Sequence, residues 1–388
     1  MLSWEFPPKR VGGISAALEG LAPAVSLTGL TVHVITAGDA GGAACEYVSP
    51  TLTINRVLVA DPYNDFFDWI QKLNEAMYEP AAQILRSARA AQEAVVLHVH
   101  DWLTMFIGLR LKNEFGVRLV TTIHATEYGR NQGIQSDVQH KIHAWECELI
   151  AASDALIVCS ESMRTEITSH HGAHWNRIRV IPNGINPADI AVTFTEDERS
   201  EFRNRFASPN QHLVFFIGRM VGEKGAHLLV EAIGRLHPSL PVKLVIAGGG
   251  AREHLENRAR GLGIWDSVYF TGRISDEDRA GLYAVADVAV YPSLYEPFGI
   301  VALEAMAAGV PVVVSDSGGF AEVVEHDVSG TTTYAGDVNS LAWGIDRVLR
   351  DRSRAMRLAE HAKSVVSTKF SWPLIANNTV EVYRNEDV

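Results

Sequence analysis

The chain has 388 residues. Single hydrophobic cores stop growing at roughly 250–300 residues, so two domains are expected. Hydrophobic residues make up 47% and charged residues 21% of the chain, a globular balance, and no stretch approaches the roughly 18 uninterrupted apolar residues of a membrane span. The net charge of −12 argues against a protein that neutralises nucleic-acid phosphates, although a local basic site for a small anion stays open.

The cysteines and the first residues indicate a compartment. Cys45, Cys147 and Cys159 are an odd number without C-x-x-C spacing, so neither a disulfide framework nor a zinc knuckle is expected. The first eight residues lack a basic start and a long apolar run, and Pro7-Pro8 interrupts any apolar stretch. A reduced, cytoplasmic protein is the prediction.

In chain order, apolar runs of strand length alternate with amphipathic runs of helix length, which predicts an α/β protein with parallel sheets wrapped by helices. In such sheets ligands bind at the carboxyl ends of the strands. The turn-rich stretch 181–187 predicts a linker, so we place one domain at 1–185, a second at 186–370 and a terminal helix in 371–388, with Ser371 as its N-cap. The predicted strands are 31–36, 94–99, 118–123, 155–159, 177–181, 213–217, 243–247, 267–271, 288–291 and 310–314.

The first glycine pair, Gly12-Gly13, precedes an amphipathic helix predicted for 15–25. Glycines at such a turn let the backbone approach a phosphate or a sugar, but a lone pair is as often a simple turn. It is not a dinucleotide fingerprint, because G-x-G-x-x-G is absent here.

Polar residues follow the strands predicted for 94–99 and 118–123. Asp101 and His124 are placed to line a sugar pocket, with Trp102 or Tyr128 as an apolar platform. His98 is assigned a structural role. The histidine-rich run 170–174 has no carboxylate or cysteine beside it in sequence, so an exposed loop without a metal is expected.

Two cations follow the strand predicted for 213–217. Arg219 and Lys224 lie on a glycine-containing loop, where they can hold a pyrophosphate and neutralise the charge of a departing phosphate without a metal. Alone they are a weak signal, because solvated surface charges are common.

The stretch from Tyr295 to Gly309 is the most informative. It reads as a loop that opens into a helix at Pro297 and ends at glycine. The amides of Phe298, Gly299 and Ile300 would be unpaired donors at the helix N-terminus, ready for a phosphate. Two glutamates lie on this stretch; a solvated pair is the ordinary interpretation, but the apolar neighbours predict burial and a need for partners. These are Glu296 and Glu304, an E-x7-E pair.

With these motifs, the chain resembles the retaining, nucleotide-sugar-dependent glycosyltransferases of the GT-B fold, the group 1 or family 4 class. The resemblance covers essentially the whole chain, and the E-x7-E motif within Tyr-Glu-Pro-Phe-Gly is its most specific part. Three stretches of the first predicted domain are similar to glycogen-synthase-like members of the family: 4–8, 100–102 and 122–124. Where those members carry Lys-x-Gly-Gly, this chain has Arg10-Val11-Gly12-Gly13, so the base and the acceptor stay open. Further matches are 218–224, 317–322 and 370–372.

The resemblance implies two Rossmann-like parallel-sheet domains facing a cleft, with the C-terminal helix crossing back to the first domain. It implies a UDP- or ADP-hexose donor, a carbohydrate or related acceptor, and no cofactor or metal. Arg219 and Lys224 would hold the diphosphate, Glu304 the ribose, and the loop with Ile274 the base. Glu296 and the 298–300 backbone would hold the donor sugar and phosphate. His124 would face the sugar beside Asp101, with Gly12 and Gly13 on the same side.

Other activities stay open at this point. A GT-B epimerase would release UDP without an acceptor, and a phosphorylase would need a pyridoxal-phosphate lysine in a much longer chain. A non-catalytic nucleotide-sugar sensor would keep Arg219, Lys224 and Glu304 but not need His124 and Asp101. Catalysis is preferred because all five are present. Contact with a membrane surface, to reach a lipid-linked acceptor, stays open, and nucleic acid is not an expected partner.

Overall fold

The computed structural model describes residues 1–39 and 42–384 and forms two compact α/β units. Unit 1 comprises Met1–Gly184 together with the chain from Trp372 onward, and unit 2 comprises Ile185–Ser371. The assignment of an acceptor side to 1–185 and a nucleotide side to 186–370 stays a prediction. No helix among the described residues combines the length and the hydropathy needed to cross a bilayer.

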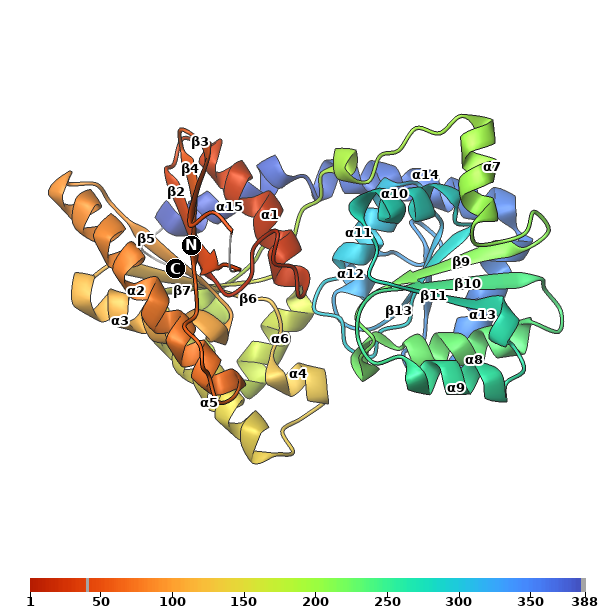
Figure 1. Ribbon diagram of the computed structural model, residues 1–388, viewed down its shortest axis with the longest axis horizontal. Helices are drawn as coiled ribbons and strands as arrows, with labels where there is room; N and C mark the ends of the chain where they lie inside the picture. Colours follow the sequence, from red (N-terminus) through yellow and green to blue (C-terminus); the bar gives the residue numbers. More distant parts are fainter. Residues whose placement is uncertain (40–41, 385–388) are drawn as a thin grey trace. The chain divides into compact units, whose positions relative to one another are not determined.

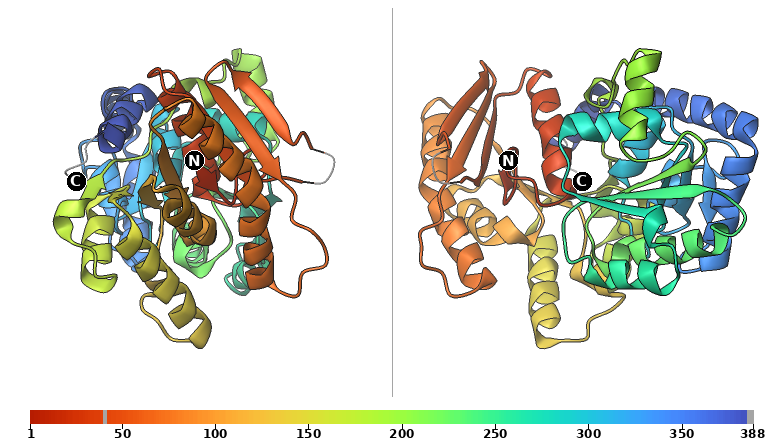
Figure 2. Two further views of the ribbon diagram at one scale, coloured as in Figure 1. Left: turned by 90° about the vertical axis from the view of Figure 1, so that its left-hand side faces the viewer. Right: turned by 45° about the vertical axis from the view of Figure 1, so that its right-hand side comes forward.

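Unit 1 is built on an eight-stranded sheet in the order β3-β4-β2-β1-β5-β6-β7-β8. All neighbours are parallel except β3 and β4, which form the antiparallel hairpin seen at the sheet edge in Figure 2. Its strands are β1 (Leu2–Ser3), β2 (Val32–Ala37), β3 (Cys45–Ser49), β4 (Leu52–Val57), β5 (Val96–His100), β6 (Arg118–Ile123), β7 (Ala155–Val158) and β8 (Ile178–Val180).

Helices cover both faces of this sheet (Figure 1). Helices α1 and α15 pack together on one face, and α2 and α3 pack together on the other. The helices of unit 1 are α1 (Gly13–Ser26), α2 (Phe66–Ala90), α3 (Met105–Phe115), α4 (Glu127–Asn131), α5 (Asp137–Ala152), α6 (Glu161–His170) and α15 (Trp372–Arg384), with short 3-10 turns η1 (Trp102–Thr104) and η2 (Trp175–Arg177).

Unit 2 has a six-stranded parallel sheet in the order β11-β10-β9-β12-β13-β14. Its strands are β9 (His212–Ile217), β10 (Val242–Ala247), β11 (Val268–Gly272), β12 (Val288–Tyr291), β13 (Val312–Ser315) and β14 (Thr331–Thr333). Its helices are α7 (Glu196–Asn204), α8 (Ala226–Leu236), α9 (Glu253–Gly261), α10 (Asp276–Val285), α11 (Ile300–Ala307), α12 (Phe320–Val323), α13 (Val338–Arg350) and α14 (Arg352–Lys369), with 3-10 turns η3 (Pro187–Asp189), η4 (Gly222–Lys224) and η5 (Trp265–Ser267).

Four strands were not among those predicted from the apolar runs. β1 has only two residues, and β3 is exposed along almost its whole length. β14 is the run Thr331–Thr333, which has no aliphatic residue. β4 alternates apolar and polar residues (Leu52–Val57) and pairs with β2 in parallel. These strands lack the continuous apolar run that marks a strand buried on both faces.

The C-terminal helix belongs to unit 1, which confirms the predicted return to the first domain. Ile375, Val380 and Val382 of α15 are buried in the same core cluster as Val34 of β2. The alternative of a terminal helix packed on the second domain alone is wrong. Close packing depends on Gly20 of α1, where an added Cβ would lie 1.9 Å from the ring of Trp372.

Candidate functional site

The site residues of unit 2 gather at the carboxyl edge of its sheet, where the strand order changes direction. From β9 the chain passes to β10 on one side, and β12 later pairs with β9 on the other side. Gly218 and Arg219 follow β9, and Glu296 follows β12. Because ligands bind at such switch points, this edge is the candidate site of unit 2.

Lys224 and Glu296 form an ion pair at this edge. The Lys224 ammonium donates to Oε2 of Glu296 at 2.7 Å, and the hydroxyl of Ser293 donates to the same oxygen at 3.2 Å. Glu296 is 7% exposed and Lys224 lies on the turn η4, just before α8. Gly225 shapes this turn: its φ is +69°, and a Cβ there would lie 2.0 Å from the carbonyl oxygen of Pro292. The Glu296 carboxylate is thus fixed in position by Lys224 and Ser293.

Arg219 lies on the same loop but has another partner. Its guanidinium donates to Oε1 of Glu223 at 3.2 Å, and its side chain is about half exposed. The structure therefore joins Lys224 to Glu296, while Arg219 stays available to solvent beside them. A half-exposed surface pair of this kind stabilises a fold little, so Arg219 can exchange Glu223 for an anionic ligand at low cost.

Glu304 is buried, as the sequence predicts, and it has partners. The Tyr283 hydroxyl donates to Oε2 at 3.0 Å, and the Arg279 guanidinium lies 3.2 Å from Oε1. Both partners come from α10, where they are four residues apart on one helix face. Sequence reasoning missed Arg279 and Tyr283. Their i, i+4 spacing indicates that the two side chains share a helix face, but it does not indicate that this face contacts Glu304 on α11.

The start of α11 differs from the prediction. The helix begins at Ile300 rather than at Pro297, because Gly299 adopts φ 107° and acts as its N-cap. Glu296 therefore lies in the preceding loop and is not a first-turn carboxylate. Among the described residues, the amides of Phe298, Gly299 and Ile300 donate to no backbone carbonyl. Three N–H groups thus remain at the positive end of the helix, a suitable place for a phosphate.

Two neighbouring loops complete this edge. In the stretch 317–322, the Gly319 amide donates to the Glu296 carbonyl at 2.8 Å. On the other side, the Gly248 amide donates to the Gly272 carbonyl at 2.8 Å, and a Cβ on Gly248 would lie 1.8 Å from the Gly218 oxygen. Gly248 thus serves close packing of the loops, and Ile274, two residues after β11, is partly buried beside them.

The site residues of unit 1 also lie at the carboxyl edge of their sheet. Glu5 follows β1, Asp101 follows β5 and His124 follows β6, and these three strands are adjacent. The Asp101 carboxylate accepts the backbone N–H of His124 at 2.6 Å. Asp101 itself has φ 58°, a left-handed conformation that is uncommon outside glycine. The structure thus brings Asp101 and His124 together.

Burial sets the charges of this pair. Desolvation raises the pKa of Asp101 to about 6, opposed by Arg130 and by the hydrogen bonds from the backbone. Desolvation, reinforced by Arg130, lowers the pKa of His124 to about 4. His124 is therefore a neutral imidazole near pH 7, and its Nε2 lies 3.0 Å from Nδ1 of His100. His98 has the structural role assigned to it, since its ring nitrogens bind Tyr383 and Thr122.

Glu5 positions the Gly12-Gly13 turn. Its carboxylate accepts the amides of Val11 at 2.6 Å and Gly12 at 2.8 Å, although it is only 1% exposed. Burial raises the pKa of Glu5, and these two hydrogen bonds oppose the increase. Sequence reasoning gave Glu5 no role, because the two-residue strand β1 that precedes it was not predicted.

The aromatic platforms are placed differently from the prediction. Trp102 is 5% exposed and packs against Phe66, Phe67 and Trp145, so it is a core residue and presents no face to a sugar. Tyr128 is partly buried, and one ring face is covered by His170, with the ring centroids 3.8 Å apart. The cause in both cases is packing between helices far apart in sequence.

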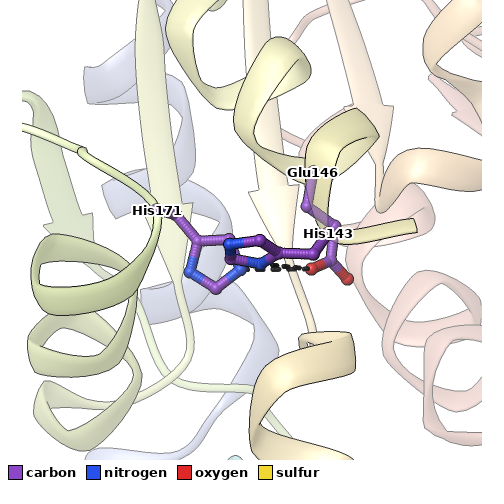
Figure 3. A group of neighbouring side chains, drawn as sticks. All are labelled: His143, Glu146 and His171. Carbon is purple, nitrogen blue, oxygen red and sulfur yellow. Dashed lines mark hydrogen bonds and ion pairs between the residues drawn. The ribbon is translucent and has the colours of Figure 1, made fainter. Parts of the chain in front are cut away.

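The histidine run 170–174 is not simply an exposed loop. The side chain of His171 is fully buried, and its Nε2 lies 3.1 Å from Oε2 of Glu146. The carboxylate missing from the local sequence is supplied by α5, 25 residues earlier. This contact between α5 and the end of α6 is shown in Figure 3.

Comparisons of sequence agree on one family. The family model described as "Glycosyl transferases group 1" matches residues 197–365, and "Glycosyltransferase Family 4" matches 11–189. An uncharacterized glycosyltransferase of Methanocaldococcus jannaschii is 37% identical over 393 residues, covering 99% of this chain and 97% of that one. The glycogen synthase of Mycobacterium tuberculosis is 34% identical over 397 residues, covering 99% and 93%.

Solved structures show the same architecture. The sucrose-phosphate synthase of Thermosynechococcus elongatus has a TM-score of 0.83 at 25% identity, covering 99% of this chain and 97% of that one. HepE of Anabaena, solved in complex with UDP-glucose, has a TM-score of 0.77 at 20% identity and covers 98% of both chains.

Proposed function

We propose a specific activity for this chain, which belongs to the group 1 glycosyltransferases of the GT-B fold. It moves a hexose from a UDP- or ADP-hexose to a carbohydrate or related acceptor, retains the anomeric configuration, and needs no metal for the diphosphate. The observation that carries this proposal is the partly buried Lys224–Glu296 pair, with the amides of 298–300 following Glu296 in the same loop.

The donor roles in unit 2 follow from charge and geometry. The amides at the start of α11 and the cations Arg219 and Lys224 would bind the diphosphate, which removes the need for a metal. Their charges would also stabilise the phosphate as it leaves. Glu304, which contacts Tyr283 and Arg279, would accept hydrogen bonds from the ribose hydroxyls. Ile274 would contact the base.

Glu296 is suited to binding rather than to attack. Its Oε2 already accepts from Lys224 and Ser293, and these two donors make the oxygen a weaker nucleophile. This favours retention by attack of the acceptor on the face from which the diphosphate leaves, with the leaving phosphate taking the acceptor's proton. Glu296 would hold hydroxyls of the donor sugar.

The roles in unit 1 rest on the Asp101–His124 pair and the Gly12-Gly13 turn. Neutral His124 can donate one hydrogen bond to a sugar oxygen while it pairs with His100. Asp101 fixes the backbone of His124. The turn at Gly12 and Gly13, held by Glu5, presents backbone without side chains to the substrate.

A thermal-shift panel of nucleotide sugars in EDTA tests the proposal. At about 100 times its dissociation constant, a donor should stabilise the protein by roughly 2.7 kcal/mol. UDP-glucose or ADP-glucose is expected to raise the melting temperature, and transfer to an oligosaccharide acceptor should proceed in EDTA. A flat panel, or a strict requirement for a divalent metal in transfer, would contradict the proposal.

Glu304→Gln should weaken donor binding with little change in turnover. A ribose contact made equally in ground and transition states is uniform binding, so its loss raises KM. We expect KM for the donor to rise on the order of 10-fold, about 1.4 kcal/mol, with kcat within about 3-fold of the wild type. Steady-state kinetics would measure both, with the exposed Glu277→Gln as matched control. A fall in kcat at unchanged KM would contradict the proposal that Glu304 binds the ribose.

The Asp101 pKa of about 6 predicts the acid limb of the pH profile. Above pH 6 the carboxylate is ionised and can accept the His124 amide; below it, protonation weakens this hydrogen bond and leaves Arg130 without its counter-charge. The rate constant kcat/KM should therefore fall as pH drops through about 6, up to tenfold per pH unit. His124, with a pKa of about 4, stays neutral there, while buried Glu5 and Glu146 are the other carboxyls facing Asp101.

The variant Asp101→Asn tests whether Asp101 causes the decline in kcat/KM at acid pH. The variant should be slower at pH 8 but should lose the decline near pH 6, because no carboxyl remains there to titrate. An unchanged acid limb in the variant would assign it to another group.

A further inference from the structure

A largely buried cluster of two imidazoles and one carboxyl group lies in unit 1 and includes none of the residues proposed to bind the donor or the acceptor. His143 and Glu146 are three residues apart on α5, so they share a helix face, and His171 follows the last residue of α6. Oε2 of Glu146 lies 3.1 Å from Nε2 of His171 and 4.0 Å from Nδ1 of His143. One donor atom from each of the three residues falls within 4.8 Å of the others (Figure 3).

The ion-pair partners of the Glu146 carboxyl are imidazole groups. The side chain of His171 is 0% exposed and that of Glu146 is 2% exposed. Within 1–39 and 42–384, no lysine or arginine forms an ion pair with Glu146. Two imidazole groups and one carboxyl group that face one another in this way are an arrangement that a bound metal ion would stabilise.

The donor set selects the kind of cation. Two imidazole nitrogens and one carboxylate oxygen suit a divalent transition metal such as zinc, which binds them at about 2.0–2.2 Å. Tetrahedral ligands at that radius lie about 3.4 Å apart, so small side-chain rotations bring the observed separations to this value. Nδ1 of His143 is buried and, in the described part of the chain, has no hydrogen-bond partner. Its lone pair can therefore turn to a metal.

We propose that His143, Glu146 and His171 form a binding site for one zinc-like divalent ion. The His143 side chain is 23% exposed, which provides an entry path and room for a water as fourth ligand. The proposal does not depend on the glycosyl-transfer activity.

The ion would stabilise the packing of three helices of unit 1. The second oxygen of Glu146 accepts the Glu127 amide at 2.8 Å, at the first residue of α4. The site thus ties together α5, the end of α6 and α4, and α4 carries Arg130, whose charge acts on Asp101. None of the three ligands is assigned to substrate, so the ion is structural and leaves the donor chemistry to the protein's cations.

The first experiment titrates metal-stripped, full-length protein with Co²⁺, followed by visible absorption. We expect one tight equivalent with the intense bands of a tetrahedral ion, displaced by Zn²⁺, and a higher melting temperature with Zn²⁺. Absence of a tight equivalent would overturn the proposal.

Variants locate the ion. His143→Gln and Glu146→Gln should each weaken Co²⁺ binding at least about 100-fold, whereas His140→Gln and His174→Gln, which replace exposed histidines nearby, should bind like the wild type. His143→Gln is the decisive variant. The His143 side chain is partly exposed, so its replacement should leave the protein folded, and circular dichroism would verify this. Tight binding that survives in His143→Gln, or that is lost in His140→Gln or His174→Gln, would show surface binding and refute the site.

Discussion

Replacement of Lys224 by alanine is expected to lower the transfer rate on the order of 100-fold or more. Lys224 is a preorganised cation, held at 2.7 Å from Glu296, and removal of one such charge-stabilising donor typically costs this much. Glu296 would also lose its counter-charge while only 7% exposed, which misplaces the carboxylate proposed to hold the donor sugar. Steady-state kinetics with the donor at saturation would show the loss in kcat.

Controls separate this effect from general charge and from misfolding. Lys369→Ala removes an exposed lysine of the same unit and should leave the rate unchanged. The double variant Lys224→Ala, Glu296→Gln should be little slower than the worse single variant, because residues that act as a unit show strongly non-additive losses. A correctly folded Lys224→Ala enzyme within 3-fold of the wild type would refute the assignment.

Removal of α15 is expected to unfold unit 1 at physiological temperature. Complete burial of a valine or isoleucine side chain stabilises a fold by about 1.5–3 kcal/mol, so Ile375, Val380 and Val382 together contribute about 5–9 kcal/mol as an upper estimate. The whole stability of a domain is about 5–15 kcal/mol. A chain ending at Ser371 should therefore lose the melting transition of unit 1 and all transfer activity, while unit 2 still binds nucleotide.

Two neighbouring residues on α15 offer a matched test that keeps the helix. Ile375 is 2% exposed and Leu374 is 41% exposed. Ile375→Ala should destabilise unit 1 by about 2–5 kcal/mol and Leu374→Ala by less than about 1 kcal/mol, as measured by urea unfolding. Equal effects of the two substitutions, or a truncated chain with native stability and transfer, would contradict the role of α15.

Much of the fold could be predicted from the sequence because it is encoded locally. The central strands β9, β10 and β12 are continuous apolar runs, and the alternation with amphipathic helices specifies parallel sheets. The same local reasoning failed for β3, β4 and β14, whose residues are exposed, alternating or polar. It also placed the start of α11 at Pro297, since the left-handed conformation of Gly299 is not visible in a residue pattern.

The sequence by itself determined the α/β architecture and the residues proposed to carry the chemistry, because apolar runs, glycine turns and the E-x7-E motif are local features of the chain. It could not determine their partners. Lys224 contacts Glu296, 72 residues away, because β9 and β12 are neighbours in the sheet. Only the tertiary structure decided that contact, the support of Glu304 by α10, and the meeting of His171 with Glu146. Such pairs depend on how elements far apart in sequence pack, and packing is a property of the whole fold.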